Sequence, residues 1–140
     1  MPVVTEQMQY KMKGGTHIEN ITQPIQETLK VSGLQAGTVT VFVKHTTASI
    51  MIIEDEPGIR GDTTRLWDQL IPSNPDWLHN THNPGEDNGH SHLRGQLQGA
   101  FVTIPFVNYT LTLGTWQQVV LIDFDTRART RDVVLQMIGE

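Results

Sequence analysis

The sequence predicts a single α+β domain, residues 1–140, in which a largely antiparallel β-sandwich has two main helices inserted between its strands. Most apolar residues fall in short segments that alternate or are rich in β-branched residues, which is typical of strands. Helical spacing of apolar residues occurs in two segments only. No internal repeat, low-complexity tract or linker marks a second domain.

The first half of the chain contains four segments that predict strands or extended chain. Val3 to Met12 alternates between two faces, which indicates a half-buried strand, and a short extended piece surrounds His17 and Ile18. The segments 38–43 (TVTVFV) and 49–53 (SIMII) are rich in β-branched residues and too apolar for edge strands. We therefore expect both of them in the interior of a sheet.

Two segments of the first half of the chain predict helices. The first helix is capped by Thr22, repeats apolar residues at Ile25 and Leu29, and stops at Gly33. A second helix follows Pro57, because its large apolar residues fall within one stripe: Ile59, Leu66, Trp67 and Leu70.

The segment 73–94 is rich in Asn, Pro, Gly, Asp and His and has almost no periodicity. It therefore predicts a long structureless loop, and such loops in folded domains are usually functional or disordered. The rest of the chain predicts strands over 101–104, 109–113 and 116–124, and a last strand over 127–138.

The charge balance and the lack of cysteine exclude several classes of function. The chain has ten Lys and Arg and fifteen Asp and Glu, which gives a formal charge of −5. This charge argues against nucleic-acid or anionic-membrane partners. Without cysteine there is no disulfide, thiolate metal site or thiol nucleophile, so a tightly held transition metal would use His and carboxylates. No signal peptide or membrane span is apparent, and we expect a cytoplasmic protein whose partners are small molecules or proteins.

Four of the six histidines crowd into the predicted loop: His79, His82, His90 and His92. Neutral imidazole is the commonest side-chain ligand of zinc, and a catalytic zinc site uses three protein ligands. His90 and His92 would converge on one ion in an extended segment and diverge in a helix. The alternative is that polar loops collect His, Asn and Asp because these residues suit turns, with no bound ion.

A second polar segment, His45-Thr46-Thr47-Ala48-Ser49, lies between the two apolar strands. Buried polar groups need partners, so this segment is either an anion or metal pocket or a set of hydroxyls bonded to the backbone. A Ser49–His catalytic pair is the weaker interpretation, because no G-x-S-x-G turn surrounds the serine.

Charged residues near the polar segments also admit two interpretations. Glu54 and Asp62 lie around the start of the second helix, where the helix dipole alone favours acids. Arg127, Arg129 and Arg131 alternate and would form a same-face row on a strand. Such a row suits either a bound phosphate or a solvated edge whose charges discourage aggregation.

Three motifs in the same order resemble the YjbQ-type proteins, also called the secondary thiamine-phosphate synthase family. They are His45-Thr-Thr-Ala-Ser49 followed by Glu54, the stretch Gly85-Glu-Asp-Asn-Gly-His-Ser-His-Leu93, and Gly114-Thr-Trp-Gln117. The resemblance runs from about Gln7 to Glu140. It implies an α+β fold with a β-sandwich, a homotrimer, and a weak or secondary thiamine-phosphate synthase activity.

The family pattern, carried over residue by residue, marks a set of catalytic candidates: His45, Thr47, Ser49, Glu54, Asp62 and Gln117. It also marks His92 and one further loop histidine. We prefer His82 to His79 for that position, and His90 is then peripheral. Together with His45, the two loop histidines form the predicted site of a divalent metal, zinc or magnesium.

These residues predict a small enzyme whose His-rich pocket binds a divalent metal or a phosphorylated small molecule within reach of Arg129 or Arg131. The resemblance implies the coupling of a pyrimidine pyrophosphate to a thiazole phosphate, in which a cation and arginines would stabilise the leaving pyrophosphate. Acid–base catalysis by His45 and His92 without a metal is a second route. The alternative function is a non-catalytic trimer that captures a metabolite or a metal.

Overall fold

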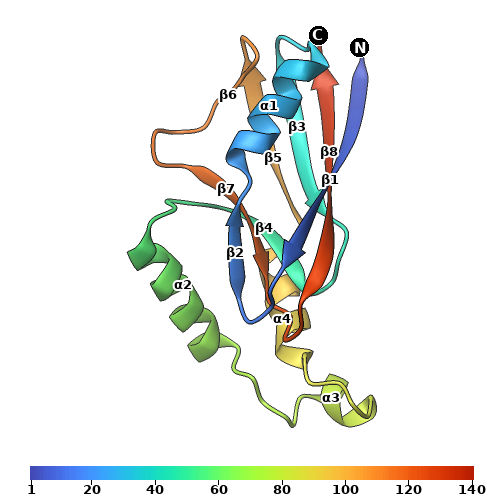
Figure 1. Ribbon diagram of the computed structural model, residues 1–140, viewed down its shortest axis with the longest axis vertical. Coiled ribbons are helices and arrows are strands. Elements are labelled where there is room, and N and C mark those ends of the chain that lie inside the picture. Colours follow the sequence, from blue (N-terminus) through green and yellow to red (C-terminus); the bar gives the residue numbers. More distant parts are fainter.

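Two antiparallel sheets form the frame of the computed structural model, which describes residues 1–140 (Figure 1). The larger sheet has five strands in the order β1, β8, β3, β5, β6: Val3–Met12, Arg129–Gly139, Gly37–Val43, Phe101–Val107 and Thr110–Leu111. The smaller sheet has three strands in the order β2, β7, β4: His17–Asn20, Gln118–Asp123 and Ala48–Ile53. The prediction of an α+β fold dominated by antiparallel strands is confirmed.

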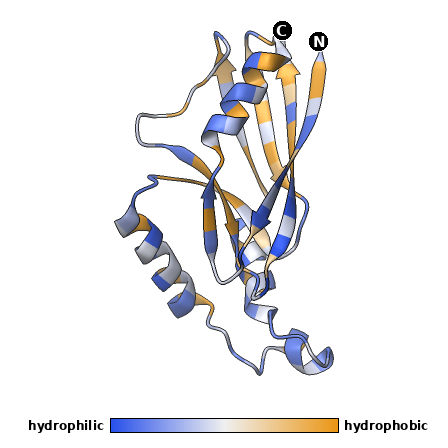
Figure 2. Ribbon diagram, viewed as in Figure 1, coloured by the Kyte–Doolittle hydropathy of each residue, from blue (hydrophilic) through white to orange (hydrophobic).

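The main core contains inward-facing side chains of both sheets. Val39 of β3 and Leu135 of β8 enter it from the larger sheet, and Leu121 of β7 enters it from the smaller one. β7 is buried on both faces, since Ile122 joins a second apolar cluster together with Trp67. Figure 2 shows the hydrophobic residues concentrated in these strands.

The first predicted helix is confirmed as α1, Thr22–Ser32, which buries Ile25 and Leu29 in the main core. The predicted Thr22 cap is wrong. Thr22 already belongs to the helix, and its backbone N–H donates to Asn20 Oδ1 at 3.0 Å. Its hydroxyl instead bonds to the backbone of Val119 in the neighbouring strand.

The second predicted helix is confirmed as α2, Pro57–Leu70, but its predicted apolar stripe is not buried as a whole. Trp67 alone is buried, with its ring 5.1 Å from that of Phe124. Leu66 and Leu70 are more than half exposed. A single large aromatic side chain is enough to attach this helix to the smaller sheet, and the flanking leucines face solvent.

The prediction of interior strands holds for β3, which lies between β8 and β5, and fails for β4, which is an edge of the smaller sheet. A helix covers this edge: α4, Gly89–Gln98. Gly95 of α4 lies so close that an added Cβ would be 2.7 Å from the carbonyl oxygen of Thr46. The apolar sequence of this edge strand is therefore explained, because α4 shields the strand from solvent.

The segment predicted as a structureless loop contains α3, Leu78–His82, and the first half of α4. Both lie at the end of the molecule opposite the termini (Figure 1). The buried residues of α4 include polar ones, among them His90 and Arg94. Arg94 donates to the carbonyl oxygen of Ile71 at 3.0 and 2.8 Å, which ties α4 to the end of α2. A helix buried through polar groups has no apolar periodicity to reveal it.

The strands of the second half differ from their predicted limits. β5 extends to Val107, β6 has only two residues, β7 begins at Gln118 and β8 at Arg129. Asn108 and Tyr109 have positive φ angles of 52° and 61°, which forms the turn that shortens β6. No helix in the fold is both long and apolar enough to cross a membrane.

Candidate functional site

An open pocket of about 480 Å³ is formed by the β3–β4 connection, the start of β8 and the α3–α4 region. None of its eleven lining residues is hydrophobic: Lys44, His45, Thr46, Thr47, His79, Glu86, Asn88, His92, Asp125, Arg129 and Arg131. Three are basic and three are histidines. Such a lining indicates a polar or charged ligand rather than an apolar one.

The strand register explains why residues far apart in sequence meet here. Ala48 of β4 pairs with Asp123 of β7, and the backbone N–H of Phe124 donates to the carbonyl oxygen of Thr47 at 2.9 Å. Thr47 and Asp125 are thereby brought together just beyond the paired segment. Arg131 reaches the same point from β8.

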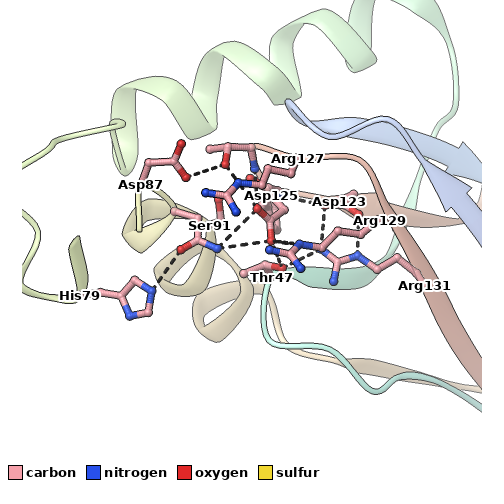
Figure 3. A network of polar contacts seen from close by, with 12 residues as sticks. Thr47, His79, Asp87, Ser91, Asp123, Asp125, Arg127, Arg129 and Arg131 are labelled. Atoms are coloured by element: carbon pink, nitrogen blue, oxygen red, sulfur yellow. Dashed lines mark hydrogen bonds and ion pairs between the residues drawn. The ribbon is translucent and has the colours of Figure 1, made fainter. Parts of the chain in front are cut away.

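Asp125 is the centre of the hydrogen-bond network in the pocket (Figure 3). Its carboxylate accepts from Thr47 Oγ1 at 2.8 Å, from Arg129 Nε at 2.8 Å and from Asn88 Nδ2 at 3.4 Å. Burial by itself raises the pKa of Asp125, but the hydrogen bonds from Thr47 and the Thr126 backbone, together with Arg129, bring it below the ordinary value. Asp125 is therefore a carboxylate at neutral pH.

Behind Asp125 lies a fully buried ion pair between Asp123 and Arg131. Arg131 Nε and Nη2 donate to the two carboxylate oxygens of Asp123 at 2.6 and 2.9 Å. Arg131 Nη2 also donates to Thr47 Oγ1 at 2.6 Å. Because the Thr47 oxygen accepts from Arg131, its hydrogen points to Asp125, and the hydroxyl has one defined orientation.

His45 lies at the edge of the pocket in its neutral form. Its Nε2 accepts the backbone N–H of Asp132 at 3.0 Å, so the ring proton is on Nδ1. Burial and the charge of Arg131 lower the pKa of His45, and they outweigh the opposite effect of the Asp132 carboxylate. As arranged, His45 offers an N–H donor through Nδ1, while its Nε2 lone pair is already used.

The rings of His79 and His92 are in contact and tilted, with centroids 4.4 Å apart and 51° between their planes. His79 Nε2 lies 3.1 Å from Asn88 Oδ1. Because the amide nitrogen of Asn88 donates to Asp125, its oxygen must accept, which assigns the proton of His79 to Nε2. Burial and the neighbouring His79 lower the pKa of His92, so His92 is a neutral base near pH 7.

Five of the sequence-predicted site residues line this pocket: His45, Thr47, His92, Arg129 and Arg131. His82 does not line it and is exposed, whereas its stated substitute His79 does. His90 is buried outside the pocket, and its Nδ1 has no hydrogen-bond partner. α3 and α4 therefore bring His79 and His92 to the site and direct the other two histidines elsewhere.

The structure does not bring the other four catalytic candidates to the pocket. Ser49 is fully buried on β4, with its hydroxyl 3.5 Å from the carbonyl oxygen of Gly95. Gln117 accepts from the backbone N–H of Gly114 at 2.8 Å within its own turn. Glu54 and Asp62 are exposed and line no part of this pocket.

Sequence reasoning missed three residues that organise the site, namely Asn88, Asp123 and Asp125. The sequence contains a signal for the two acids: Asp123 interrupts the apolar run Val119 to Phe124, and Asp125 follows that run directly. A carboxylate within a strand buried on both faces needs a buried partner or a function. Asn88 carried no such signal, since Asn is common in turns.

The predicted three-histidine metal site does not match the arrangement of these residues. No group of three or more His, Asp or Glu side chains is placed to hold one ion. The Nε2 atoms of His45 and His79 are engaged with Asp132 and Asn88.

The comparison with protein families returns one family over nearly the whole chain. Residues 6–140 match the family described as UPF0047 protein YjbQ-like. A UPF0047 protein of Synechocystis is 36% identical over 128 residues, which cover 90% of this chain and 86% of that protein. The UPF0047 protein YugU of Bacillus subtilis is 30% identical over 133 residues, which cover 94% of this chain and 97% of the relative.

Solved structures of similar proteins have the same fold. A YbjQ-like protein of unknown function from Sulfolobus solfataricus superposes with a TM-score of 0.93 at 27% identity, covering 99% of both chains. A hypothetical protein from Aeropyrum pernix gives a TM-score of 0.90 at 31% identity, covering 98% of this chain and 99% of that one.

Proposed function

This chain belongs to the UPF0047 YjbQ-like family, and we propose that its polar pocket binds a small phosphorylated molecule and catalyses its conversion by acid–base chemistry. The observation that carries the proposal is the pocket lining, in which Lys44, Arg129 and Arg131 stand beside three imidazoles with no hydrophobic residue. Such N–H donors bind phosphate, and such imidazoles transfer protons.

Arg129 is the best placed residue for an anion. Its hydrogen bond to Asp125 uses Nε alone, so both terminal nitrogens of its guanidinium remain available. Its side chain is 42% exposed, which lets a ligand from solvent reach it. Arg131 is buried and bonded to Asp123 and Thr47, so its main role is to hold the site together.

His92 is the proposed general base. Its ring makes no hydrogen bond to the protein, its pKa is lowered by burial and by His79, and it lines the pocket. His79 is oriented by the chain of hydrogen bonds through Asn88 to Asp125. In many enzymes a carboxylate orients a histidine by a direct hydrogen bond. Here the Asn88 amide lies between the Asp125 carboxylate and His79.

The reaction to test first is the coupling implied by the family resemblance, in which the thiazole nitrogen forms a C–N bond to the pyrimidine methylene carbon as the C–O bond to pyrophosphate breaks. The attacking nitrogen loses no proton, so this reaction tests the anion-binding residues, and other phosphorylated substrates test the general base. The leaving pyrophosphate carries developing negative charge, which Lys44 and Arg129 would stabilise. Whether this coupling is the main reaction or a secondary one is decided by comparing its rate with that of other phosphorylated substrates.

The test compares His92→Gln with the control His82→Gln, which changes an exposed histidine outside the pocket. If His92 is a general base, its replacement lowers turnover by roughly 10²–10⁴-fold while substrate affinity, measured by calorimetry, stays nearly constant. Arg129→Gln should instead weaken binding of inorganic phosphate. Full turnover by His92→Gln with an intact fold would overturn the catalytic part of the proposal.

The alternative function, a non-catalytic metabolite- or metal-binding trimer, gives a different result in the same assays. It predicts saturable binding with a fixed stoichiometry and no turnover of any substrate. A bound zinc or magnesium ion stays a prediction, which elemental analysis of protein purified without an affinity tag tests. The homotrimer is also a proposal, and light scattering counts the copies.

A further inference from the structure

A second opening adjoins the polar pocket, between the β3–β4 connection and the C-terminal half of α4. Its volume is about 320 Å³, and we call it the side cleft. It is lined by His45, Thr46, Ala48, Gly95, Gln96 and the pair Gly99–Ala100. Its surface is mostly apolar, and His45 is the only ionisable residue in it. The side cleft therefore differs in chemistry from the polar pocket, which contains one lysine and two arginines.

His45 and Thr46 line both openings. A molecule that extends past these two residues would therefore occupy the polar pocket and the side cleft together. The Nε2 atom of His45 accepts from the backbone N–H of Asp132, and its Nδ1–H has no partner in the chain. This N–H is available to an acceptor at the junction of the two openings, such as the ester oxygen that joins a phosphate to an organic group.

Backbone contacts hold the walls of the side cleft in place. The backbone N–H of Val43 donates to the carbonyl oxygen of Ala100 at 2.9 Å, and that of Gly99 donates to the carbonyl oxygen of Gly95 at 2.9 Å. Gly95 lies against the backbone of Thr46, where a Cβ would have no room, whereas a Cβ added to Gly99 would meet nothing within 4 Å. The side cleft is thus formed before any ligand binds, as is usual for small-molecule sites.

We infer that the side cleft binds the uncharged organic group of the molecule whose phosphate lies in the polar pocket; this inference rests on the proposed function and narrows its substrate class. The phosphate itself belongs in the polar pocket, because the side cleft contains no Lys or Arg to bind it. An apolar group is stabilised in the side cleft because its surface leaves water. A cavity of about 150 Å³ holds a benzene ring, so the side cleft has room for a substituted ring.

Two simpler classes of phosphorylated molecule fit this lining less well. Inorganic phosphate and pyrophosphate have no organic group and would leave the side cleft unused. A small sugar phosphate would place hydroxyls against Ala48 and Ala100, whose side chains offer no hydrogen bonds. The favoured substrate class is therefore a phosphate ester whose organic group is uncharged and mostly apolar.

The experiment measures the affinities of two probes by calorimetry: inorganic phosphate and 2-cyclohexylethyl phosphate, whose two-carbon chain lets the ring pass His45. We expect the unmodified chain to bind the ring-bearing probe roughly tenfold or more tightly than inorganic phosphate, because the ring leaves water. Ala100→Leu and Gln96→Trp, which add larger side chains to the lining, should each remove this advantage. The control Leu97→Trp changes the neighbouring residue of α4, which is 62% exposed and does not line the cleft, and should keep the advantage.

Circular dichroism shows which variants fold, and either of the two lining variants is sufficient for the test. Equal affinities of the two probes for the unmodified chain would overturn the side cleft as a binding site and leave phosphate binding by the polar pocket standing. An advantage of the ring that persists in the folded lining variants would overturn it as well. Failure of both probes to bind the unmodified chain would instead overturn the proposed function, and this inference with it.

Discussion

Strands β7 and β8 bury two different kinds of side chain on the same inward faces. Away from the pocket they contribute Leu121 and Leu135 to the main core, without directional contacts. Toward the pocket, Asp123 takes the inward position of β7 after Leu121, and Arg131 takes the one on β8 after Val133. Both are buried, and hydrogen bonds of 2.6 and 2.9 Å join them. Each strand, one from each sheet, thus changes from apolar to ionic burial at its pocket end.

The apolar end and the ionic end of these strands should respond differently to substitution. Apolar burial contributes in proportion to the area removed from water, and the loss of part of a side chain costs a matching part of that contribution. Ionic burial contributes only while both partners are present, because an unpaired buried charge is far less stable than a hydrated one. The pocket end is therefore precise in geometry and intolerant of single changes.

The largest expected effect is that of Asp123→Ala, which removes the two hydrogen bonds from Arg131 to Asp123 and leaves the buried guanidinium only the more distant Asp125, at 3.7 Å. We expect a loss of about 3–5 kcal/mol in the free energy of unfolding, measured by urea denaturation. Removing both partners, in Asp123→Ala with Arg131→Met, should recover much of this loss, because neither charge of the pair then remains buried, and Asp125 keeps Arg129 as its partner.

The matched core variant is Leu135→Ala, whose cost of about 2–5 kcal/mol comes from lost contacts and a cavity. No second substitution that removes a neighbouring apolar group should restore it. If the Asp123→Ala, Arg131→Met double variant is as unstable as Asp123→Ala alone, the distinction between the two ends fails.

A smaller effect should appear as pH dependence, confined to the polar end. Burial lowers the pKa of His45, His90 and His92 below 6.5, so the unfolded chain binds protons more readily than the folded one. Stability is then fully present above pH 6.5 and is lost as the pH falls toward the folded-state pKa values. Asp125, whose pKa lies below 3.8, adds a second loss in stronger acid.

Urea midpoints at about pH 7.5 and 5.5 check this expectation, since histidine titrates between them. His90→Gln should reduce the difference between the two midpoints, because His90 is buried and its Nδ1 has no partner. Leu135→Ala should lower both midpoints and leave their difference unchanged. Equal midpoints for the unmodified chain at the two pH values would contradict the assigned protonation states.

The smallest effect is expected for His82→Ala. His82 is exposed at the end of α3, three residues from His79, and does not line the pocket. We expect a change within about 0.5 kcal/mol in unfolding free energy and no change in phosphate binding. A large loss of binding would restore His82 to the site and displace His79.

The strands were predictable because each carries its own signal. Val3 to Met12 alternates along its length, and the apolar run of β3 matches a strand between two neighbours. α4 was not predictable from periodicity, since its buried positions include His90 and Arg94. The edge position of β4 was not predictable either, because α4 covers that edge and its apolar sequence is typical of an interior strand.

The site was predictable in part, through residue types that bond or titrate. The sequence motifs mark His45, Thr47 and His92, and all three line the pocket. The choice between His79 and His82 needed the direction in which α3 faces, which the hydrogen bond from His79 to Asn88 reveals. The same motif marks Ser49, but its side chain is buried in the fold and does not line the pocket.

Local periodicity and residue chemistry are properties of neighbouring residues. They are therefore enough to predict the fold class, most strands, the two main helices and the polar segments from which the pocket is built. The pairing of Asp123 with Arg131 does not follow from the sequence, nor do the hydrogen bonds of Asp125 with Thr47, Asn88 and Arg129. These contacts join residues that are distant along the chain, and strand register and helix orientation set them. A buried charge finds its partner only when the whole fold has formed.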